Sequence, residues 1–528
     1  MNGLHDLAER FYRWKYSEYP VTASDAGRHD DDHRLADYSP AAVDARRRAL
    51  TAFGEEFRAL DGREADADAA ADFRIVAAAL EREDFRHTVL RRETRDPQLY
   101  VDECLNGIFS LLKKEYAPVP VRARAATARM RAMPVFLDQA RSNLTEAVGL
   151  YADLAIDAVD GAGALFTESL AILDDGSAGE GARALSQVRD RALAALQRFG
   201  AWLREERPRM HHPVAMGREA YARLLRDVLL LPITPDEVVS LGESELARAR
   251  AAQAWMTPAA ASFTPPAAPR NQDEFLAGYE AHTDGLVRFL EDRDILTVPD
   301  DIGPFYCRAL PEAFNPTAPG GFMNPPGVFD ADPAGFYFIP TYDPAPVNFF
   351  LRAAIEDPRP ILAHEGIPGH HLQISLANRH DNPVRRYHDD AVFMEGWAFY
   401  TEEMLERCGL YAERPDTRLQ VMQLLRMRAA RIAVDVRLAT GDWTFEQAVD
   451  YFATEGGLDR DAARGEAAGA AAMPGYKIQY LVGKWQIERL LGRVRDREGA
   501  AFSLRRFHDR LLSFGSIPVS IVETLMLP

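Results

Sequence analysis

The feature that most limits the fold is a series of long segments rich in Ala, Arg, Glu and Leu. Apolar residues recur in these segments at spacings of three and four, which is the period of an amphipathic helix. Ser39 before Pro40, Thr234 before Pro235, and Thr444 are typical helix starts. We therefore predict a mostly α fold, with helices over 40–60, 66–92, 119–143, 145–172 and 180–206.

Two segments depart from this helical pattern. Residues 257–272 are rich in Pro and Ala, which predicts a surface loop. Residues 311–348 hold too many Pro and Gly residues for a helix, and a loop this long in a compact protein is usually functional. Within it, GFYFIPTYD (335–343) is aromatic and β-branched and predicts a short strand. This small β element directly precedes the helix expected to carry the motif described below.

With 528 residues, the chain is long enough to form two or more hydrophobic cores. We predict a helical N-terminal lobe at 1–230. The second lobe, 231–528, would contain the 311–348 segment and the motif. The two lobes could form one continuous domain.

Charge and hydropathy exclude two classes of partner. The formal net charge of −18 argues against nucleic acid, because phosphates require clustered Lys and Arg. The sequence contains no run of about 18 apolar residues that would predict a membrane span, and the N-terminus lacks the apolar segment of a secretory leader.

The cysteines and the lack of such segments bear on the expected location. Cys104, Cys307 and Cys408 lie far apart, as expected of free thiols in a reducing compartment. We expect a cytoplasmic protein; its oligomeric state is not indicated.

A histidine motif at LAHEGIPGHHLQ (362–373) points to metal chemistry. His364 and Glu365 open like the HExxH helix of zinc hydrolases, but Pro368 stands where the second histidine belongs. In an unbroken helix neither His370 nor His371 could share a metal with His364. Pro368 removes a helical hydrogen bond and the following glycine permits unusual backbone angles, so the helix can open and return a later histidine. On spacing alone, either histidine could be the second ligand.

The third ligand is expected on the next helix, in FMEGWAFYTEEMLE (393–406). Glu395 lies 31 residues after His364, which is enough for a loop and an antiparallel return. Two histidines and a glutamate would leave one position of a single Zn²⁺ ion for water, and Glu365 could act as the general base. Glu402 lies on the same helical face as Glu395. We expect Glu402 and its neighbour Glu403 to be solvated or to support a ligand.

The pair HEGIPGHHLQ and EGWAFYTEE resembles the DUF885 family pattern HExxPGHxxQ with a later EGWAxYxE, and the resemblance spans nearly the whole chain. It implies a zinc metallohydrolase, mostly peptidase-like, with a helical fold related to that of gluzincins. It also implies His364, His370 and Glu395 as metal ligands and Glu365 as the base. His371 then becomes a candidate for supporting a ligand or contacting substrate.

The C-terminal part departs from the family pattern. An expected histidine is Ala439, an Arg-Tyr pair is Gly469 and Ala470, and a glutamine is Tyr476. Tyr480 matches the pattern. Tyr480 and Tyr476 are both candidates for donating a hydrogen bond to the oxyanion. Arg431 is expected either to bind a substrate carboxylate or to pair with Asp435 four residues later.

Three functions are compatible with these features. The first is a zinc hydrolase that cleaves an amide or peptide bond in a small molecule or short peptide, with Glu365 moving the proton. The second is a specialised, biosynthetic member of the same family that acts on one dedicated amide or ester or catalyses a non-hydrolytic step. The third is a metal-free helical binding protein on a decayed enzyme scaffold.

Overall fold

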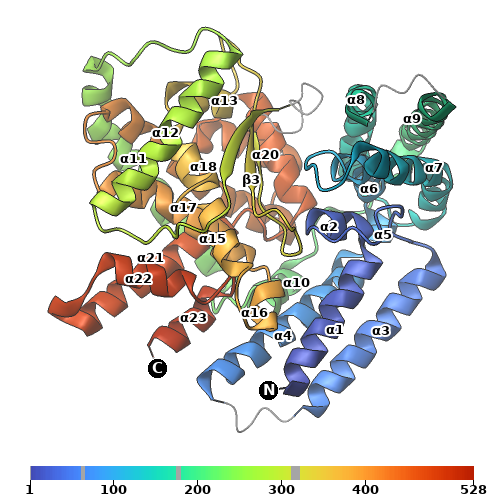
Figure 1. Ribbon diagram of the computed structural model, residues 1–528, viewed down its shortest axis with the longest axis horizontal. Helices are drawn as coiled ribbons and strands as arrows, with labels where there is room; N and C mark the ends of the chain where they lie inside the picture. The colour runs from blue at the N-terminus through green and yellow to red at the C-terminus, as the bar shows by residue number, and fades with distance from the viewer. Residues whose placement is uncertain (1, 61–65, 174–179, 311–320, 528) are drawn as a thin grey trace.

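The computed structural model describes residues 2–60, 66–173, 180–310 and 321–527, and it confirms the mostly α fold with one small sheet (Figure 1). The N-terminal half contains α1 Asn2–Glu18, α2 Pro20–Asp25, α3 Pro40–Ala59, α4 Ala67–Phe85, α5 Arg92–Arg95, α6 Pro97–Phe109, α7 Val119–Asn143, α8 Gly149–Leu173, α9 Glu180–Glu206 and α10 Arg218–Arg223. The five helices predicted from periodicity are therefore all present, although the one predicted over 66–92 ends as an α-helix at Phe85 and continues as a π-helical turn, Arg86–Leu90.

The C-terminal half continues the helical pattern around the sheet. Its elements are α11 Pro235–Ser262, α12 Gln272–Asp292, β1 Phe305–Ala309, β2 Phe322–Asn324, β3 Gly335–Ile339, α13 Phe349–Glu356, α14 Arg359–Glu365, α15 His370–Ala377, α16 Pro383–Tyr387, α17 Ala391–Arg407, α18 Pro415–Thr440, α19 Phe445–Tyr451, α20 Arg460–Ala472, α21 Gln479–Glu498, α22 Leu504–Leu512 and α23 Val519–Met526. The helix starts at Ser39, Thr234 and Thr444 are confirmed, since each side chain caps its helix.

Two predictions at the loops need correction. The surface loop at 257–272 was placed too early, because α11 continues through Pro258 to Ser262, carried by the alanines around that proline. The motif does not follow the 311–348 segment directly, because α13 lies between them. Residues 311–320 of that segment lie outside the described residues.

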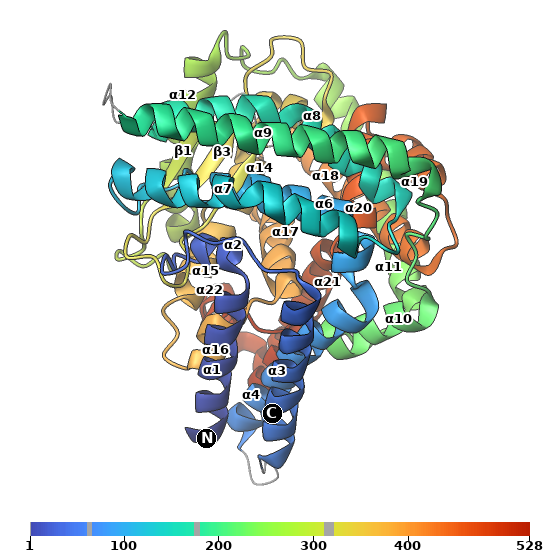
Figure 2. The same ribbon diagram turned by 90° about the vertical axis from the view of Figure 1, so that its right-hand side faces the viewer.

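Hydrophobic packing does not follow the predicted division at residue 230. The largest core cluster joins residues of α1, α3 and α4 to the sheet, α12, α14, α17 and α21–α23. A second cluster, within residues 19–210, holds α6 to α9 together beside it (Figure 2). The first helices of the chain thus pack against the half that carries the motif, while the lobe boundary itself stays a prediction.

The sheet has the order β1-β3-β2, with β3 parallel to β1 and antiparallel to β2. The predicted strand in GFYFIPTYD is β3, and all five of its residues are buried. Its first residue, Gly335, lies against α15: a Cβ there would be 2.3 Å from Nδ1 of His371. The small β element therefore does lie beside the motif.

Close packing of α17 and α21 brings two motif-bearing helices together. A Cβ on Gly483 would lie 2.0 Å from the carbonyl oxygen of Val392, and a Cβ on Gly396 would lie 2.5 Å from the backbone of Gly483. Only glycine at both positions allows this backbone contact. The contact sets Tyr480, one turn before Gly483, near the acidic residues of α17.

None of the described helices is both long and apolar enough to cross a membrane. The three cysteines are free; Cys104 and Cys307 are buried, and Cys408 is partly exposed. The cellular location of the protein stays a prediction.

Candidate metal centre

The motif helix breaks where Pro368 and Gly369 predict that it should. Helix α14 ends at Glu365 and α15 begins at His370, with a turn between them that contains a cis Ile367–Pro368 peptide bond. A Cβ on Gly369 would lie 1.9 Å from the carbonyl oxygen of His364, so no other residue fits this turn. The prediction that Pro-Gly opens the helix is confirmed.

Helix α17 holds the turn in place from the other side. The indole Nε1 of Trp397 donates a hydrogen bond of 2.8 Å to the carbonyl oxygen of Pro368. One turn later, Oγ1 of Thr401 donates to the carbonyl oxygen of Ala363 at 3.0 Å. Both side chains are fully buried, so the relative positions of α14, α15 and α17 are tightly constrained.

His364, His370 and Glu395 form a cluster with the geometry of a metal site. Their ligand atoms all lie within 4.8 Å of one another, and all three residues are buried. Oε2 of Glu395 is 3.6 Å from Nε2 of His364 and 3.4 Å from Nε2 of His370. Ligands at ~2.0–2.2 Å from a tetrahedral zinc ion are separated by roughly 3.2–3.6 Å, so these spacings fit such an ion.

The hydrogen bonding of the cluster also fits a cation. Oε2 of Glu395 is buried and has no hydrogen-bond partner among the described residues. Burial would lower the pKa of His364, but the Glu395 and Glu402 carboxylates raise it to about 9. A proton on His364 would thus balance the carboxylates in the metal-free protein, and a divalent cation would displace it.

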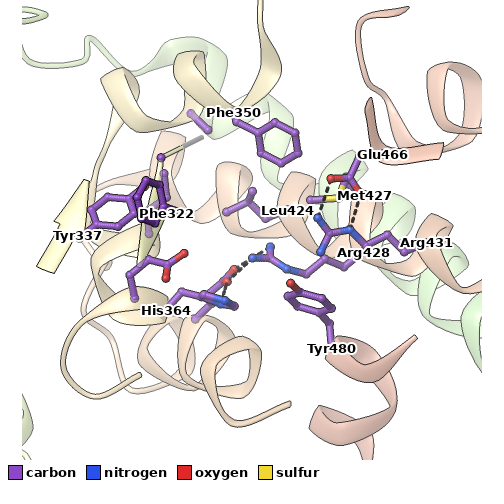
Figure 3. Close-up of a pocket in the computed structure, with 15 residues that line it drawn as sticks. Phe322, Tyr337, Phe350, His364, Leu424, Met427, Arg428, Arg431, Glu466 and Tyr480 are labelled. Atoms are coloured by element: carbon purple, nitrogen blue, oxygen red, sulfur yellow. Dashed lines mark hydrogen bonds and ion pairs between the residues drawn. The ribbon is translucent and has the colours of Figure 1, made fainter. Parts of the chain in front are cut away.

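Glu402 orients the first histidine. Its Oε1 accepts a hydrogen bond of 2.8 Å from Nδ1 of His364. A carboxylate can only accept, so Nδ1 carries a proton, and the lone pair of Nε2 faces the cluster once a cation displaces the second proton. Arg428 binds the same carboxylate through both terminal nitrogens, at 2.7 and 3.2 Å (Figure 3). Of the two roles expected for Glu402, support of a ligand is the one found.

Replacing Glu402 by Gln is expected to weaken zinc binding by about 10–100-fold, the usual effect of losing a carboxylate behind a histidine ligand. Zinc affinity would be measured by competition with a chromophoric chelator. Glu403→Gln is the matched control, because Glu403 is equally buried but binds Arg248, Arg407 and Lys484 instead of a histidine. Equal zinc affinities in the two variants would contradict the role of Glu402.

Glu365 and His364 form part of the wall of a cavity of about 330 Å³. Glu365 is half-buried and makes no hydrogen bond with the described residues, so its carboxylate is free to act. Burial raises its pKa, while His364 and His370 act in the opposite direction. Phe322, Phe350, Leu424 and Met427 line the apolar side of the same cavity (Figure 3).

The two predicted tyrosines have different surroundings. Tyr480 lines the cavity, and its ring stacks at 6.1 Å from the ring of His364. The hydroxyl of Tyr476 donates to Oε1 of Glu395 instead. Since that hydroxyl has one proton, Tyr476 cannot also donate to a substrate. Tyr476 is therefore corrected from oxyanion donor to a residue that positions Glu395.

Arg431 does not pair with Asp435, which corrects one of its two predicted roles. Its Nε and Nη2 donate to the Glu466 carboxylate of α20 at 2.7 and 2.9 Å. Asp435 instead accepts from the hydroxyl of Tyr221 and from the backbone N–H groups of Gly475 and Lys477, at 2.7 to 2.9 Å. Asp435 thus holds the turn that carries Tyr476. Arg431 does line the cavity, as substrate binding would require.

His371 lies away from the cavity and is corrected as a substrate-contacting candidate. It is fully buried, and its Nε2 is 2.7 Å from the carbonyl oxygen of Gly303. Its ring packs against Phe305 and the Gly335 end of β3. Of the two histidines, His370 joins the cluster, and His371 joins α15 to the sheet.

Among the charged side chains at the cavity, sequence reasoning missed Arg428 and Glu466, which line it, and Lys477, which contacts Glu466. Arg428, Glu466 and Lys477 come from α18, α20 and the turn before α21, and no local spacing pairs them with the motif. For Arg428 the available signal was its position three residues before Arg431, on the same face of the helix.

The fold and the cluster define a class: a mostly α protein with a His-His-Glu cluster at the break of an HExxPGHH helix. The chain belongs to the DUF885 family, described as bacterial proteins of unknown function, whose pattern matches residues 20–526. This confirms the family resemblance.

Two solved structures share the fold over almost the whole chain. A candidate lipoprotein of unknown function from Shewanella oneidensis is 20% identical, with a TM-score of 0.79, and the match covers 99% of this chain and 100% of the other. A candidate lipoprotein from Colwellia psychrerythraea is 18% identical, with a TM-score of 0.82, covering 99% and 98%. At these identities the likeness shows the fold alone. No curated protein matches the chain significantly.

Proposed function

We propose that the protein is a zinc-dependent hydrolase that cleaves an amide or peptide bond in a small substrate. The observation that carries the proposal is the convergence of His364, His370 and Glu395 beside a cavity that Glu365 also lines. Two histidines and one glutamate, with a fourth position left open, are a ligand set of catalytic zinc sites. A zinc ion held there supplies an activated water nucleophile and stabilises negative charge on the substrate carbonyl.

Four side chains of the protein would carry out proton transfer, oxyanion stabilisation and positioning of the ligands. The free carboxylate of Glu365 takes a proton from the attacking water and passes it to the leaving nitrogen. Tyr480 donates its hydroxyl proton toward the carbonyl oxygen as negative charge develops. Glu402 keeps the His364 ring in one orientation, and Tyr476 holds one oxygen of Glu395 so that the other faces the histidines.

A specialised reaction on one dedicated amide or ester is the second candidate. Tyr476 favours it, because a residue that departs from the family pattern contacts the ligand Glu395 directly. Retained zinc together with failure on a broad peptide library would support this candidate over a general peptidase. The convergence of the cluster weighs against the third hypothesis, a decayed scaffold, which expects the three side chains to lie apart.

Removal of the metal tests the proposal. The purified protein is expected to hold one zinc ion per chain by elemental analysis and to hydrolyse members of a short-peptide library. Dialysis against a chelator should abolish the activity, and one equivalent of zinc should restore it. A protein that binds no divalent metal at micromolar concentration would overturn the proposal.

A further inference from the structure

Beside the cavity, two cations share a single carboxylate: Arg431 and Glu466 line the cavity, whereas Lys477 contacts Glu466 without lining it. Arg431 binds Glu466 through two nitrogens, and Nζ of Lys477 is 3.1 Å from Oε2 of the same residue. The three side chains expose only 8% to 12% of their surface. Burial would raise the pKa of Glu466, but Arg431 and Lys477 hold it well below its usual value. Burial lowers the pKa of Lys477, while Glu466 acts in the opposite direction. With Lys477 protonated, the cluster contains one more positive than negative charge.

The other acidic residues nearby do not neutralise this excess positive charge by ion pairs with Arg431 or Lys477. Both oxygens of Asp435 are occupied by backbone N–H groups and the hydroxyl of Tyr221. Glu402 is neutralised by Arg428. Glu395 lies close enough to act on both cations electrostatically, but its oxygens face Tyr476 and the two histidines. A bound metal ion would further offset its charge.

Arg431 keeps donor capacity toward the cavity. Its Nε and Nη2 are used on Glu466, whereas Nη1 donates to no described residue. The guanidinium carbon lies 4.6 Å from the centre of the Tyr480 ring, and that ring centre lies 6.1 Å from the ring centre of His364. One aromatic ring thus separates the cationic cluster from the metal cluster. This spacing suits a carboxylate one or two residues from the cleaved carbonyl, because consecutive Cα atoms are about 3.8 Å apart.

The rest of the cavity suits an apolar group. Phe350, Leu424 and Met427 lie above His364 and beside the Arg431–Glu466 pair, as Figure 3 shows. A volume of about 330 Å³ lies at the lower end for small-molecule sites. The cavity therefore combines His364 of the metal cluster, Arg431 of the cationic cluster and an apolar wall in a space fit for a small molecule.

We propose that Arg431, with the added positive charge of Lys477 beside it, holds a free carboxylate of the substrate, which makes the substrate a dipeptide or N-acyl amino acid with an apolar side chain. The inference rests on the proposed hydrolase function. Hydrolysis breaks the amide C–N bond; the water oxygen forms the C–O bond of the new carboxylic acid, and a proton passes to the nitrogen of the released amino acid. A guanidinium group binds such carboxylates by charge-assisted hydrogen bonds, and a second cation nearby strengthens the attraction.

The test compares two probes that differ only in charge, N-acetylphenylalanine and N-acetylphenylalanine amide. Binding is measured by calorimetry on the full chain with zinc and after chelation, while release of phenylalanine or its amide is followed in parallel. The acid is expected to bind at least tenfold more tightly than the amide. In Lys477→Gln this preference should fall below about threefold, and Lys477→Arg should restore it.

Lys477→Gln leaves the Arg431–Glu466 pair intact, so no buried carboxylate loses its only partner. Equal binding of acid and amide, or an unchanged preference in Lys477→Gln, would overturn the carboxylate site. Hydrolysis of both probes at equal rates would contradict the proposed carboxylate site but support the proposed hydrolase function. A preference for the acid without hydrolysis of any amide would support the proposed carboxylate site but contradict the proposed hydrolase function.

Discussion

Replacing Glu365 by Gln is expected to lower the rate of hydrolysis by about 10²–10⁴-fold, the usual contribution of a general base. Glutamine has the size and shape of glutamate but cannot take a proton from water and pass it on. Glu365 makes no hydrogen bond with the described residues, so the substitution breaks no contact that supports the fold. The variant should keep one zinc ion per chain and unfold at an unchanged temperature. The rate, the zinc content and the unfolding midpoint would be measured on one preparation.

The control for this variant is Glu356→Gln, the same substitution nine residues earlier. Glu356 is exposed on α13 and does not line the cavity. Its replacement should leave the rate within about twofold, as is usual for a surface change. Full activity in the Glu365 variant, with zinc present, would show that another group moves the proton.

Replacing His370 by Ala is expected to weaken zinc binding, whereas replacing His371 by Ala is expected to lower the stability of the fold. His370→Ala removes a direct ligand, so zinc affinity should fall by more than about 100-fold, beyond the effect of losing a supporting residue. His371→Ala removes the contact with the Gly303 carbonyl and the packing against Phe305. It should therefore lower the free energy of unfolding by about 1–3 kcal/mol and change zinc affinity little.

These two variants control for each other, because the residues are adjacent, buried and chemically identical. Zinc affinity would be measured by chelator competition. The free energy of unfolding would be measured by urea titration of the zinc-free proteins, so that metal binding does not contribute to it. Zinc loss in His371→Ala with retention in His370→Ala would reverse the assignment of the second ligand.

The sequence predicted those features of the fold and the site that depend on residues close together in the chain. Periodicity predicted the helices, and the caps at Thr234 and Thr444 were correct because an N-cap bonds within its own first turn. Pro368 and Gly369 predicted the helix break, because the backbone limits of proline and glycine act within four residues. The start of the loop predicted at residue 257 was misplaced, because the alanines around Pro258 favour helix strongly enough for α11 to continue past this proline.

Partners far apart in the sequence were decided by tertiary structure. Arg431 has a possible partner four residues away in Asp435, yet it binds Glu466, because backbone N–H groups of the turn before α21 already occupy Asp435. The choice of His370 over His371 likewise depends on α17, whose Glu395 meets only one of them. The sequence by itself determined the helices, the broken motif and the candidate ligand types. The packing of α14, α17, α18 and α20 determined which charges meet, because side chains on different helices become neighbours only when those helices bury their apolar faces together.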